Sequence, residues 1–542
     1  MSNAKACGFN AFLVSGISLP LEADEAEAYR IAGSELKRAG INPARLRFRI
    51  YRKSVDARKR AQIKLVYSVA ASCDEPISAD ADRLSRHKIT PLDSGEIEIV
   101  FGNEPQKAPP LVVGMGPAGL FCALLLAEQG YAPVIIDRGD NIEDRVRATE
   151  RFIKTGALDV ESNVQFGAGG AGTFSDGKLL TRVNDARVSY ILKRFCDFGA
   201  PEEIMTEAKP HIGTDRLRGV VDNMLSRIEE LGGRVVYRCR LVDVCENADG
   251  TLSAKTTKGD FLCSSLVLAT GHSARDIYSM LMDKGYAIAP KDFSVGFRIE
   301  HRREDIDRAL YGDFAGHKKL GAAEYHLSDT KEERGVYTFC MCPGGEVVAG
   351  ASEEGGVVVN GMSNYSRNGD NSNSALLASV FCKDYGGTPS GAIEFQRMLE
   401  RRAFALGGSD YRAPVATVGD FLNGKSGSEP SRIMPTYREG RVTLARVDTL
   451  FPEYITNTLR RGIMAFDKKL SGFAVPDAVI SAVETRTSAP VRVLRGDDMT
   501  AIGHSLVYPC GEGAGYAGGI TSAALDGIRV ALAIIKRFAP ME

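Results

Sequence analysis

The alternation of apolar and polar residues predicts a small α+β unit at the start of the chain. The apolar stretch FNAFLVSGISL precedes helical spacing from about Glu22 to Ala39, which Gly40 would end. RLRFRIY, from Arg45 to Tyr51, alternates strictly, and IKLVYSVAA predicts the next strand. We therefore expect residues 1–102 to form an N-terminal α+β domain of the ferredoxin-like type.

A buried strand and a glycine-rich turn are predicted after the polar link GNEPQKAPP. Leu111 to Val113 form a short β-branched run, and Gly114, Gly116 and Gly119 then spell G-x-G-x-x-G before helical apolar spacing that Gly130 ends. Glycines at these positions let a pyrophosphate approach the positive N-terminal end of the helix. The pattern predicts a dinucleotide site, and a purely structural βαβ turn is the alternative.

Three further segments extend this prediction. The strand Pro133 to Ile136 leads to Asp137, about 20 residues after the glycines, where a carboxylate can accept hydrogen bonds from a ribose diol. Residues 234–271 predict a β-meander that returns to a buried strand and stops at Thr270 and Gly271. Near the C-terminus, SLVYPCGEGAGYAGGITSAALDG predicts a strand, a glycine-rich turn and a helix.

The stretch NVQFGAGGAGTFSDGKLL, residues 163–180, repeats the glycine spacing in a different setting. Gly167, Gly169 and Gly172 spell G-x-G-x-x-G, but no β-branched strand precedes them and no apolar helix follows. The stretch therefore fails the test for a second Rossmann turn. A flexible linker is the alternative, which its large apolar side chains disfavour because they need burial.

Composition and charge narrow the class of protein. The chain has 542 residues with 68 Lys and Arg against 69 Asp and Glu, which argues against a chain that is basic throughout, as many nucleic-acid binders are. Between Arg45 and Lys64, however, nine basic residues meet one Asp, which predicts a basic sheet face. That face is either a solvated surface or a site for an anionic partner such as RNA.

Cysteine usage and hydropathy predict a cytoplasmic protein without membrane contact. The eleven cysteines lack the regular spacing of a disulfide framework, which fits reduced thiols. The longest apolar runs, such as GLFCALLLA, are far shorter than the roughly 20 residues that span a bilayer, and no leader pattern opens the chain. No metal site is expected, because His and Cys do not recur at ligand spacing.

The sequence resembles the two-dinucleotide-binding-domain flavoproteins of the glutathione-reductase type. Those proteins carry the G-x-G-x-x-G motif after their first strand and an A-T-G after the meander. They also carry a C-terminal G-D before a helix whose N-terminus points at the flavin. Here the A-T-G is Ala269 to Gly271, and Glu512 stands in place of the usual Asp. The resemblance implies bound FAD, with the backbone of Val242 near the adenine.

A closer resemblance is to a family of bacterial proteins described as uncharacterised FAD-dependent dehydrogenases. It covers almost the whole chain through strings such as DARKR, GGAGTFSDGKL, ATGHSARD, VGFRIEH, FCMCPGG, NGMS, ETRTSAPVR and CGEGAGYAGGITSAALDG. This resemblance implies FAD and an appended N-terminal domain, and it implies no particular substrate.

The expected fold is α/β. A Rossmann-type FAD-binding domain would comprise residues 108–290 and 426–542, with an inserted, mainly antiparallel β substrate domain at residues 291–425 that caps the flavin. The residues expected to bind FAD are Gly114, Gly116, Pro117, Ala118, Gly119, Asp137, Arg138, Gly167, Gly169, Gly170, Gly172, Thr173, Asp176, Gly177, Lys178, Val242, Thr270, Gly271, Gly511, Glu512, Gly519, Ile520 and Thr521.

Six residues are candidates for catalysis, each with a structural alternative. His272 could touch the flavin, and Arg298 could hold a substrate anion or pair with a neighbouring Glu. The other four candidates are His301, Cys340, Cys342 and Arg486.

The two cysteines share one face of a predicted strand. In a regular strand their Cα atoms would lie roughly 6.5 Å apart, near the outer limit for a disulfide. Core packing or substrate-facing thiols are therefore expected before a dithiol relay.

The leading hypothesis is an FAD-dependent oxidoreductase, a dehydrogenase, that transfers a hydride or electrons between flavin and a small organic substrate. No second nucleotide domain is predicted, so NAD(P)H would bind transiently if it is used. One alternative is a flavin-dependent RNA-modifying or RNA-binding protein that uses the basic N-terminal face. Another is a non-catalytic, flavin-holding interaction protein.

Overall fold

The computed structural model describes residues 7–92, 95 and 97–541, which divide into two compact units. Unit 1 comprises residues up to 97 together with 182–211 and 307–323, and unit 2 comprises residues 98–181, 212–306 and 324 onward. The two later segments of unit 1 were predicted to belong to other domains. Residues 182–211 were assigned to the FAD-binding domain, and residues 307–323 to the substrate domain. The reason is that segments distant in sequence pair with unit 1 through backbone contacts, which local patterns do not report.

Unit 1 contains a four-stranded antiparallel sheet in the order β2-β3-β1-β4. Its elements are β1 (Cys7–Pro20), α1 (Glu25–Arg38), β2 (Arg47–Asp56), β3 (Lys64–Ala79), α2 (Ala81–Arg86) and β4 (Ile89–Pro91). The predicted helix and both predicted strands are confirmed. Helix α5 (Arg187–Asp197) also belongs to this unit.

The basic face of unit 1 is partly neutralised by its own carboxylates. Arg47 pairs with Asp74, and Lys53 lies 3.1 Å from a carboxylate oxygen of Glu25. Such exposed pairs contribute only about 0–1 kcal/mol, so they would yield readily to a competing anion. An anionic partner of this face stays a prediction.

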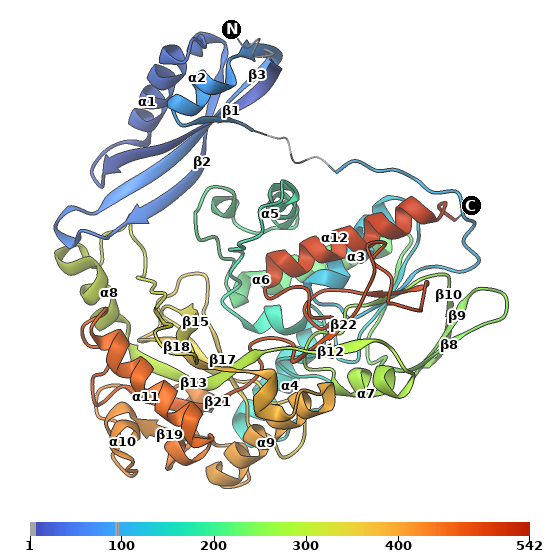
Figure 1. Cartoon of the computed structure of the whole chain (residues 1–542), viewed down its shortest axis with the longest axis vertical. Helices are drawn as coiled ribbons and strands as arrows, with labels where there is room; N and C mark the ends of the chain where they lie inside the picture. Colours follow the sequence, from blue (N-terminus) through green and yellow to red (C-terminus); the bar gives the residue numbers. More distant parts are fainter. Residues whose placement is uncertain (1–6, 93–94, 96, 542) are drawn as a thin grey trace. The chain divides into compact units, whose positions relative to one another are not determined.

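The centre of unit 2 is a five-stranded parallel sheet in the order β23-β11-β5-β6-β7. Its strands are β5 (Leu111–Val113), β6 (Val134–Ile136), β7 (Arg234–Val236), β11 (Leu266–Leu268) and β23 (Val507–Pro509). Helix α3 (Pro117–Glu128) follows β5 and is buried over nearly its whole length, which explains why it is apolar on every side. It lies alongside α12 (Ile520–Arg537), drawn in red in Figure 1.

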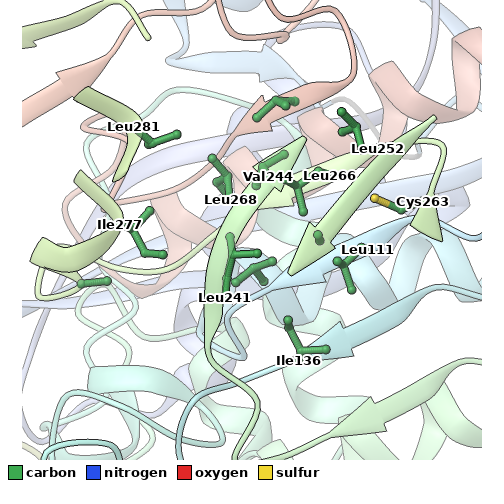
Figure 2. Close-up of a cluster of buried hydrophobic side chains, with 14 of the residues drawn as sticks. Leu111, Ile136, Leu241, Val244, Leu252, Cys263, Leu266, Leu268, Ile277 and Leu281 are labelled. Carbon is green, nitrogen blue, oxygen red and sulfur yellow. The ribbon is translucent and has the colours of Figure 1, made fainter. Parts of the chain in front are cut away.

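The opposite face of the parallel sheet is covered by an antiparallel meander and a helix. The meander is β8 (Leu241–Glu246), β9 (Leu252–Thr256) and β10 (Gly259–Cys263), and the helix is α7 (Arg275–Asp283). Figure 2 shows their side chains meeting those of the parallel strands in one apolar cluster. Leu111 and Val113 point into this cluster, whereas the intervening Val112 is equally buried outside it. Burial on both faces explains the continuous apolar run of β5.

A second, seven-stranded sheet has the order β14-β15-β18-β13-β21-β19-β20. Its strands are β13 (Phe293–Arg302), β14 (Ser328–Asp329), β15 (Val336–Cys342), β18 (Asn371–Val380), β19 (Ala413–Thr417), β20 (Val442–Leu444) and β21 (Val479–Glu484). All neighbours are antiparallel except β19 and β20. The predicted boundary at residue 425 is wrong, because β20 and β21 join this sheet from later in the chain.

The remaining elements connect and cover these sheets. The further helices are α4 (Ile142–Thr155), α6 (Thr214–Glu230), α8 (Arg303–Tyr311), α9 (Pro389–Gly407), α10 (Val418–Asn423) and α11 (Glu453–Asp467). Two short ribbons pair β12 (Ile288–Pro290) with β22 (Val491–Val493) and β16 (Glu346–Ala349) with β17 (Val359–Met362). Among helices in the described part of the chain, none combines the length and apolar composition needed to cross a bilayer.

Candidate functional site

The turn between β5 and α3 accepts only glycine at two positions. Gly114 has φ +108°, and a Cβ there would lie 2.3 Å from the carbonyl oxygen of Ala269. A Cβ on Gly119 would lie 1.9 Å from the carbonyl oxygen of Gly114. Gly116 caps α3 without a side-chain hydrogen bond to the first turn of the helix. The turn therefore leaves the positive end of α3 open to an anion.

The carboxylate of Asp137 holds three segments together. It accepts hydrogen bonds of 2.9 Å from the backbone N–H groups of Met115, Gly139 and Gly167. These bonds link the end of β6 to the glycine turn and to the loop of residues 163–180. Asp137 is buried beside the turn, and its contact with a ribose stays a prediction.

The loop of residues 163–180 packs directly on the glycine turn. The N–H of Gly169 donates to the carbonyl of Met115 at 2.9 Å, and a Cβ on Gly170 would lie 2.9 Å from the Cα of Gly116. The fully buried guanidinium of Arg145 donates to loop carbonyls, among them that of Ala168 at 2.6 Å. Sequence reasoning missed Arg145, because it lies on α4 with no local sign that its side chain turns inward.

Helix α12 brings a second open N-terminus to the same region. Its N-cap, Gly519, makes no side-chain cap, and the Thr521 hydroxyl donates to the carbonyl of Leu179 at 2.7 Å. Asp526 lies within α12. Its carboxylate accepts a hydrogen bond from the N–H of Gly511 at 2.7 Å and so fixes the turn that precedes the helix. Sequence reasoning missed Asp526 because its partner lies before the helix.

The two helix ends and the glycine loop enclose a cavity of about 350 Å³. Many predicted site residues line it. These are Gly114, Gly116, Pro117, Ala118, Asp137, Gly170, Gly172, Asp176, Gly177, Lys178, Thr270, Gly271, His272, Cys340, Arg486, Glu512, Gly519 and Ile520. The wall also contains Gln165, Phe339, Asn360 and Glu484, which were not predicted as site residues.

Other predicted residues lie outside the lining of this cavity. Arg138 and Val242 border a neighbouring groove of about 1030 Å³, and the side chain of Val242 is 47% exposed. The cofactor candidates Gly119, Gly167, Gly169, Thr173, Gly511 and Thr521 are absent from the lining, as are the catalytic candidates Arg298, His301 and Cys342.

A chain of hydrogen bonds fixes the tautomer of His272. The carbonyl of Gly350 can only accept a hydrogen bond, so the side-chain NH₂ group of Gln165, 3.4 Å away, donates to it. The side-chain oxygen of Gln165 therefore faces Ser273. The Ser273 hydroxyl donates to that oxygen at 3.2 Å, and Nδ1 of His272 therefore donates to Ser273 at 3.0 Å. Nε2 is left as an acceptor.

His272 is also held neutral. Burial, followed by the positive charges of Arg486 and Arg275, lowers the pKa of His272 to about 3. An imidazole with this pKa stays neutral near neutral pH, so its unprotonated Nε2 can accept a hydrogen bond but takes up a proton poorly. The residue can therefore orient a donor group in the cavity.

The two candidate arginines, Arg298 and Arg486, each form an ion pair with a carboxylate of the protein. Arg298 is fully buried and donates to Glu484 at 2.5 Å and to the carbonyl of Cys340 at 2.7 Å. Arg486 lines the cavity, but its Nη2 and Nε donate to the buried Glu400 at 2.9 and 3.1 Å. Arg486 forms part of the cavity wall, Arg298 binds wall residues from outside the lining, and neither offers an unpaired fork for a substrate anion. The alternative in which Arg298 pairs with its neighbour Glu300 is wrong, since Glu484 takes that place.

His301 lies away from the cavity. Its Nε2 donates to the carbonyl of Phe473 at 2.8 Å, and burial lowers the pKa of its ring. The structure thus places this candidate in the core of the seven-stranded sheet.

The charged groups on the cavity wall include Lys178 and Glu512. The ammonium group of Lys178 lies 2.6 Å from a carboxylate oxygen of Asp176, which also binds Arg367 at 2.5 Å. Burial raises the pKa of Glu512 to about 7, against the opposing charge of Lys291. The wall thus combines a fixed cation with a carboxyl group that titrates near neutrality.

The site fits a dinucleotide with an anionic centre and a flat apolar end. Two glycine-capped helix N-termini open on one cavity, and the close packing at Gly114 and Gly119 fixes the turn that precedes the first of them. The parallel sheet, its glycine turn and this cavity define a nucleotide-cofactor-binding α/β protein.

Comparison with known proteins specifies the cofactor and the family. A family model described as "FAD-dependent protein, C-terminal domain-like" matches residues 292–487, and a domain of unknown function (DUF8436) matches residues 14–72. FAD is the cofactor of this protein. A protein of Clostridium beijerinckii described as an uncharacterized protein is 46% identical over 497 residues, covering 91% of this chain and 93% of its own. The chain belongs to the family of that clostridial protein.

Similar solved structures include several flavoproteins. CtdE in complex with FAD has a TM-score of 0.31 at 10% identity, over 79% of this chain and 84% of its own. The flavin-dependent halogenase CmlS has a TM-score of 0.35 at 12% identity, over 79% and 58% of the two chains. The amino acid oxidase NikD has a TM-score of 0.31 at 11% identity, over 80% and 94%.

Proposed function

We propose that this protein is an FAD-dependent oxidoreductase that exchanges a hydride or electrons with a small organic substrate, and that it acts as a dehydrogenase. One observation carries the proposal: two open helix N-termini and a glycine-only turn meet at one cavity whose wall also holds His272, Cys340 and Lys178. Bound FAD would supply the redox chemistry. The chain supplies binding, orientation and charge.

The residues divide into those that would hold the cofactor and those that would face a substrate. The α3 end with Gly114 and Gly116 suits the pyrophosphate, because backbone N–H groups and the helix dipole favour negative charge there. The α12 end at Gly519 would stabilise negative charge on the flavin. On the wall, the acceptor Nε2 of His272 would orient an O–H or N–H group of the substrate.

The proposed domain architecture follows the same division. The parallel sheet with its covering helices is assigned as a Rossmann-type FAD-binding domain, and the seven-stranded sheet as the inserted substrate domain. In unit 1, the element order β-α-β-β-α-β and the sheet order β2-β3-β1-β4 support a ferredoxin-like assignment. The ten cysteines from Cys73 to Cys510 are free thiols, which supports a cytoplasmic location.

A charge placed at the α3 end tests the cofactor site. Gly116 has room for a side chain, since a Cβ there would lie 3.9 Å from its nearest neighbour, the Cα of Gly170. An Asp at an N-cap favours the helix but repels a phosphate, so Gly116→Asp should fold and yet lose flavin affinity about tenfold or more. Gly116→Ser, an uncharged N-cap, is the matched control and should retain more flavin.

The reaction itself is tested on the purified holoprotein. The released chromophore is identified, and NADH, NADPH and a metabolite library are screened under anaerobic conditions for loss of the flavin's visible absorbance. Reduction by a member of the library identifies a substrate, and reduction by a nicotinamide identifies a transient donor. Full absorbance with every compound would contradict the oxidoreductase assignment and favour a flavin-holding role.

A further inference from the structure

Strand β15 is irregular where its two cysteines lie. Phe339 pairs with Ala375 and Cys342 with Asn373, so two residues of β15 oppose one residue of β18 between those pairs. Cys340 has φ +42°, a left-handed conformation that a residue with a side chain rarely adopts. The regular-strand spacing that disfavoured a disulfide therefore does not apply, because a bulge bends the strand at this point.

Neighbouring groups hold Cys340 in this strained conformation. Nη1 of Arg298 donates to the carbonyl of Cys340 at 2.7 Å, and the thiol of Cys342 donates to the same carbonyl at 3.3 Å. Arg298 is itself fixed by Glu484 and by Asn360, whose side-chain oxygen lies 2.9 Å from Nη2. Strain of this kind persists only where the surroundings enforce it, and it concentrates at functional sites.

The two thiols differ in access and in charge. Cys340 is partly exposed on the cavity wall, whereas Cys342 is fully buried behind it. The adjacent Cys342 thiol, and then the positive charges of Lys178 and Arg298, lower the pKa of Cys340 against the effect of burial. The same coupling raises the pKa of Cys342. The charged groups around this pair include Lys178, Asp176, Arg298, Glu484 and Glu512.

We propose that Cys340 and Cys342 form a dithiol centre that a small disulfide compound oxidises at the cavity wall. The inference goes beyond the proposed flavin reaction and does not depend on it. An accessible thiol with a buried thiol beside it matches an attacking and a resolving cysteine. The substrate class is a low-molecular-weight disulfide, RSSR, that fits the cavity.

The exchange balances in two displacements. The Cys340 thiolate attacks one sulfur of RSSR, forms a mixed disulfide and releases the first thiolate, RS⁻. Cys342 then loses its proton, its sulfur attacks that of Cys340, and the second RS⁻ leaves. The two thiolates take up the two protons of the dithiol, so RSSR is reduced to two RSH while Cys340 and Cys342 are oxidised to one disulfide.

The test uses the holoprotein and 2-hydroxyethyl disulfide as the probe. After exposure, removal of the probe, denaturation and alkylation, the peptide that contains both cysteines should resist alkylation and be lighter than the dithiol form by two hydrogens. Cys342→Ser should stop at a mixed disulfide on Cys340, and Cys340→Ser should leave Cys342 unreacted. Cys382→Ser, a partly exposed cysteine whose sulfur lies 3.0 Å from the Tyr385 hydroxyl, is the matched control and should behave as wild type.

A second measurement needs no variant. At a pH near 6, alkylation of Cys340 in the wild-type protein should be about tenfold faster than alkylation of Cys382, because the thiolate is the reactive form. Full alkylation of Cys340 and Cys342 after exposure to the probe would overturn the proposal. So would a Cys342→Ser protein that binds flavin normally but traps no mixed disulfide. Each result is independent of whether a flavin substrate is found.

Discussion

His272 shows how a backbone carbonyl outside the cavity lining, acting through two residues of the wall, sets the chemistry of a third. The Gly350 carbonyl determines the orientation of Gln165, which determines the donor direction of Ser273 and hence the tautomer of the imidazole. None of these contacts is local in sequence apart from that of Ser273. At the scale of single residues, the sequence could therefore name His272 as a candidate but could not specify which nitrogen faces a substrate.

The tautomer of His272 can be measured directly. Ring nitrogen shifts from selectively labelled protein should show one neutral form, protonated at Nδ1, from about pH 5 to about pH 8, because the pKa is lowered to about 3. Ser273→Ala removes the acceptor of that proton and should release a mixture of tautomers. A ring that becomes protonated near its ordinary pKa of 6.5 would contradict the assignment.

The same pKa predicts a pH effect on stability. The unfolded chain binds a proton at His272 below about pH 6.5, whereas the folded state does not until about pH 3. The stabilising contribution is thus present above pH 6.5 and is lost as the pH falls. Compared with His272→Asn, the wild-type protein should lose on the order of 1–2 kcal/mol of unfolding free energy between about pH 6.5 and pH 4.5, measured by urea denaturation.

At the scale of elements, the turn into α3 depends on contacts that only glycine permits. Gly119→Ala would place a methyl group 1.9 Å from the carbonyl oxygen of Gly114, so the turn must move. We expect a loss of about 2 kcal/mol or more in unfolding free energy together with weaker flavin binding. The control is Gly219→Ala in α6, where nothing lies within 4 Å of the added Cβ. That variant should be stabilised by about 0.5–1 kcal/mol, and equal effects at both sites would contradict the packing argument.

Helix α9 carries a buried carboxylate, Glu400, that pairs with two arginines. Glu400 is 1% exposed and accepts from Nη2 of Arg275 at 2.7 Å and from Nη2 of Arg486 at 2.9 Å. Glu400→Gln should cost roughly 3–5 kcal/mol, because the buried guanidinium of Arg486 loses its counter-charge and that of Arg275 keeps only Glu353. Glu394→Gln on the same helix removes an exposed partner of Arg397 and should cost at most about 1 kcal/mol. Thermal unfolding at neutral pH compares the two variants.

Elements were predictable where the sequence signal is local. The strand at Leu111–Val113, the helix that follows it and the strand before Asp137 are confirmed, since hydrophobic period and glycine position specify each one. The extent of the seven-stranded sheet was not predictable. β21 belongs to it only because its backbone pairs with β13, almost two hundred residues earlier, and no property of β21 alone reports that partner.

At the scale of the whole molecule, the cavity assembles distant parts of unit 2. Its lining runs from Gly114 to Ala523 and includes the glycine loop, the end of β11 and the bulge of β15. A ligand that contacts all of these segments stabilises only their joint folded state. Sequence motifs could locate most of the wall one segment at a time, whereas Gln165 and Glu484 enter it through tertiary packing.

Unit 1 is also assembled from separated stretches, which predicts the effect of removing its first part. The N–H of Lys53 on the outer strand β2 donates to the carbonyl of Thr206 at 2.6 Å, and the N–H of Ala208 donates back to Lys53 at 2.8 Å. Lys319 donates to the carbonyl of Leu21 at 2.6 Å. A chain that lacks residues 1–97 would leave the segments 182–211 and 307–323 without these partners.

Limited proteolysis measures that loss. Relative to the full chain, the truncated chain should be cleaved about tenfold faster or more within 182–211 and 307–323, because exposed backbone without hydrogen-bond partners opens readily. Cleavage within α4, which belongs to unit 2, should be unchanged and serves as the internal control. Equal resistance of the two chains would mean that the first 97 residues form a separable domain, as the composition of the link at residues 102–110 predicts. Faster cleavage confined to the two segments would show that residues 182–211 and 307–323 need the first 97 residues in order to stay folded.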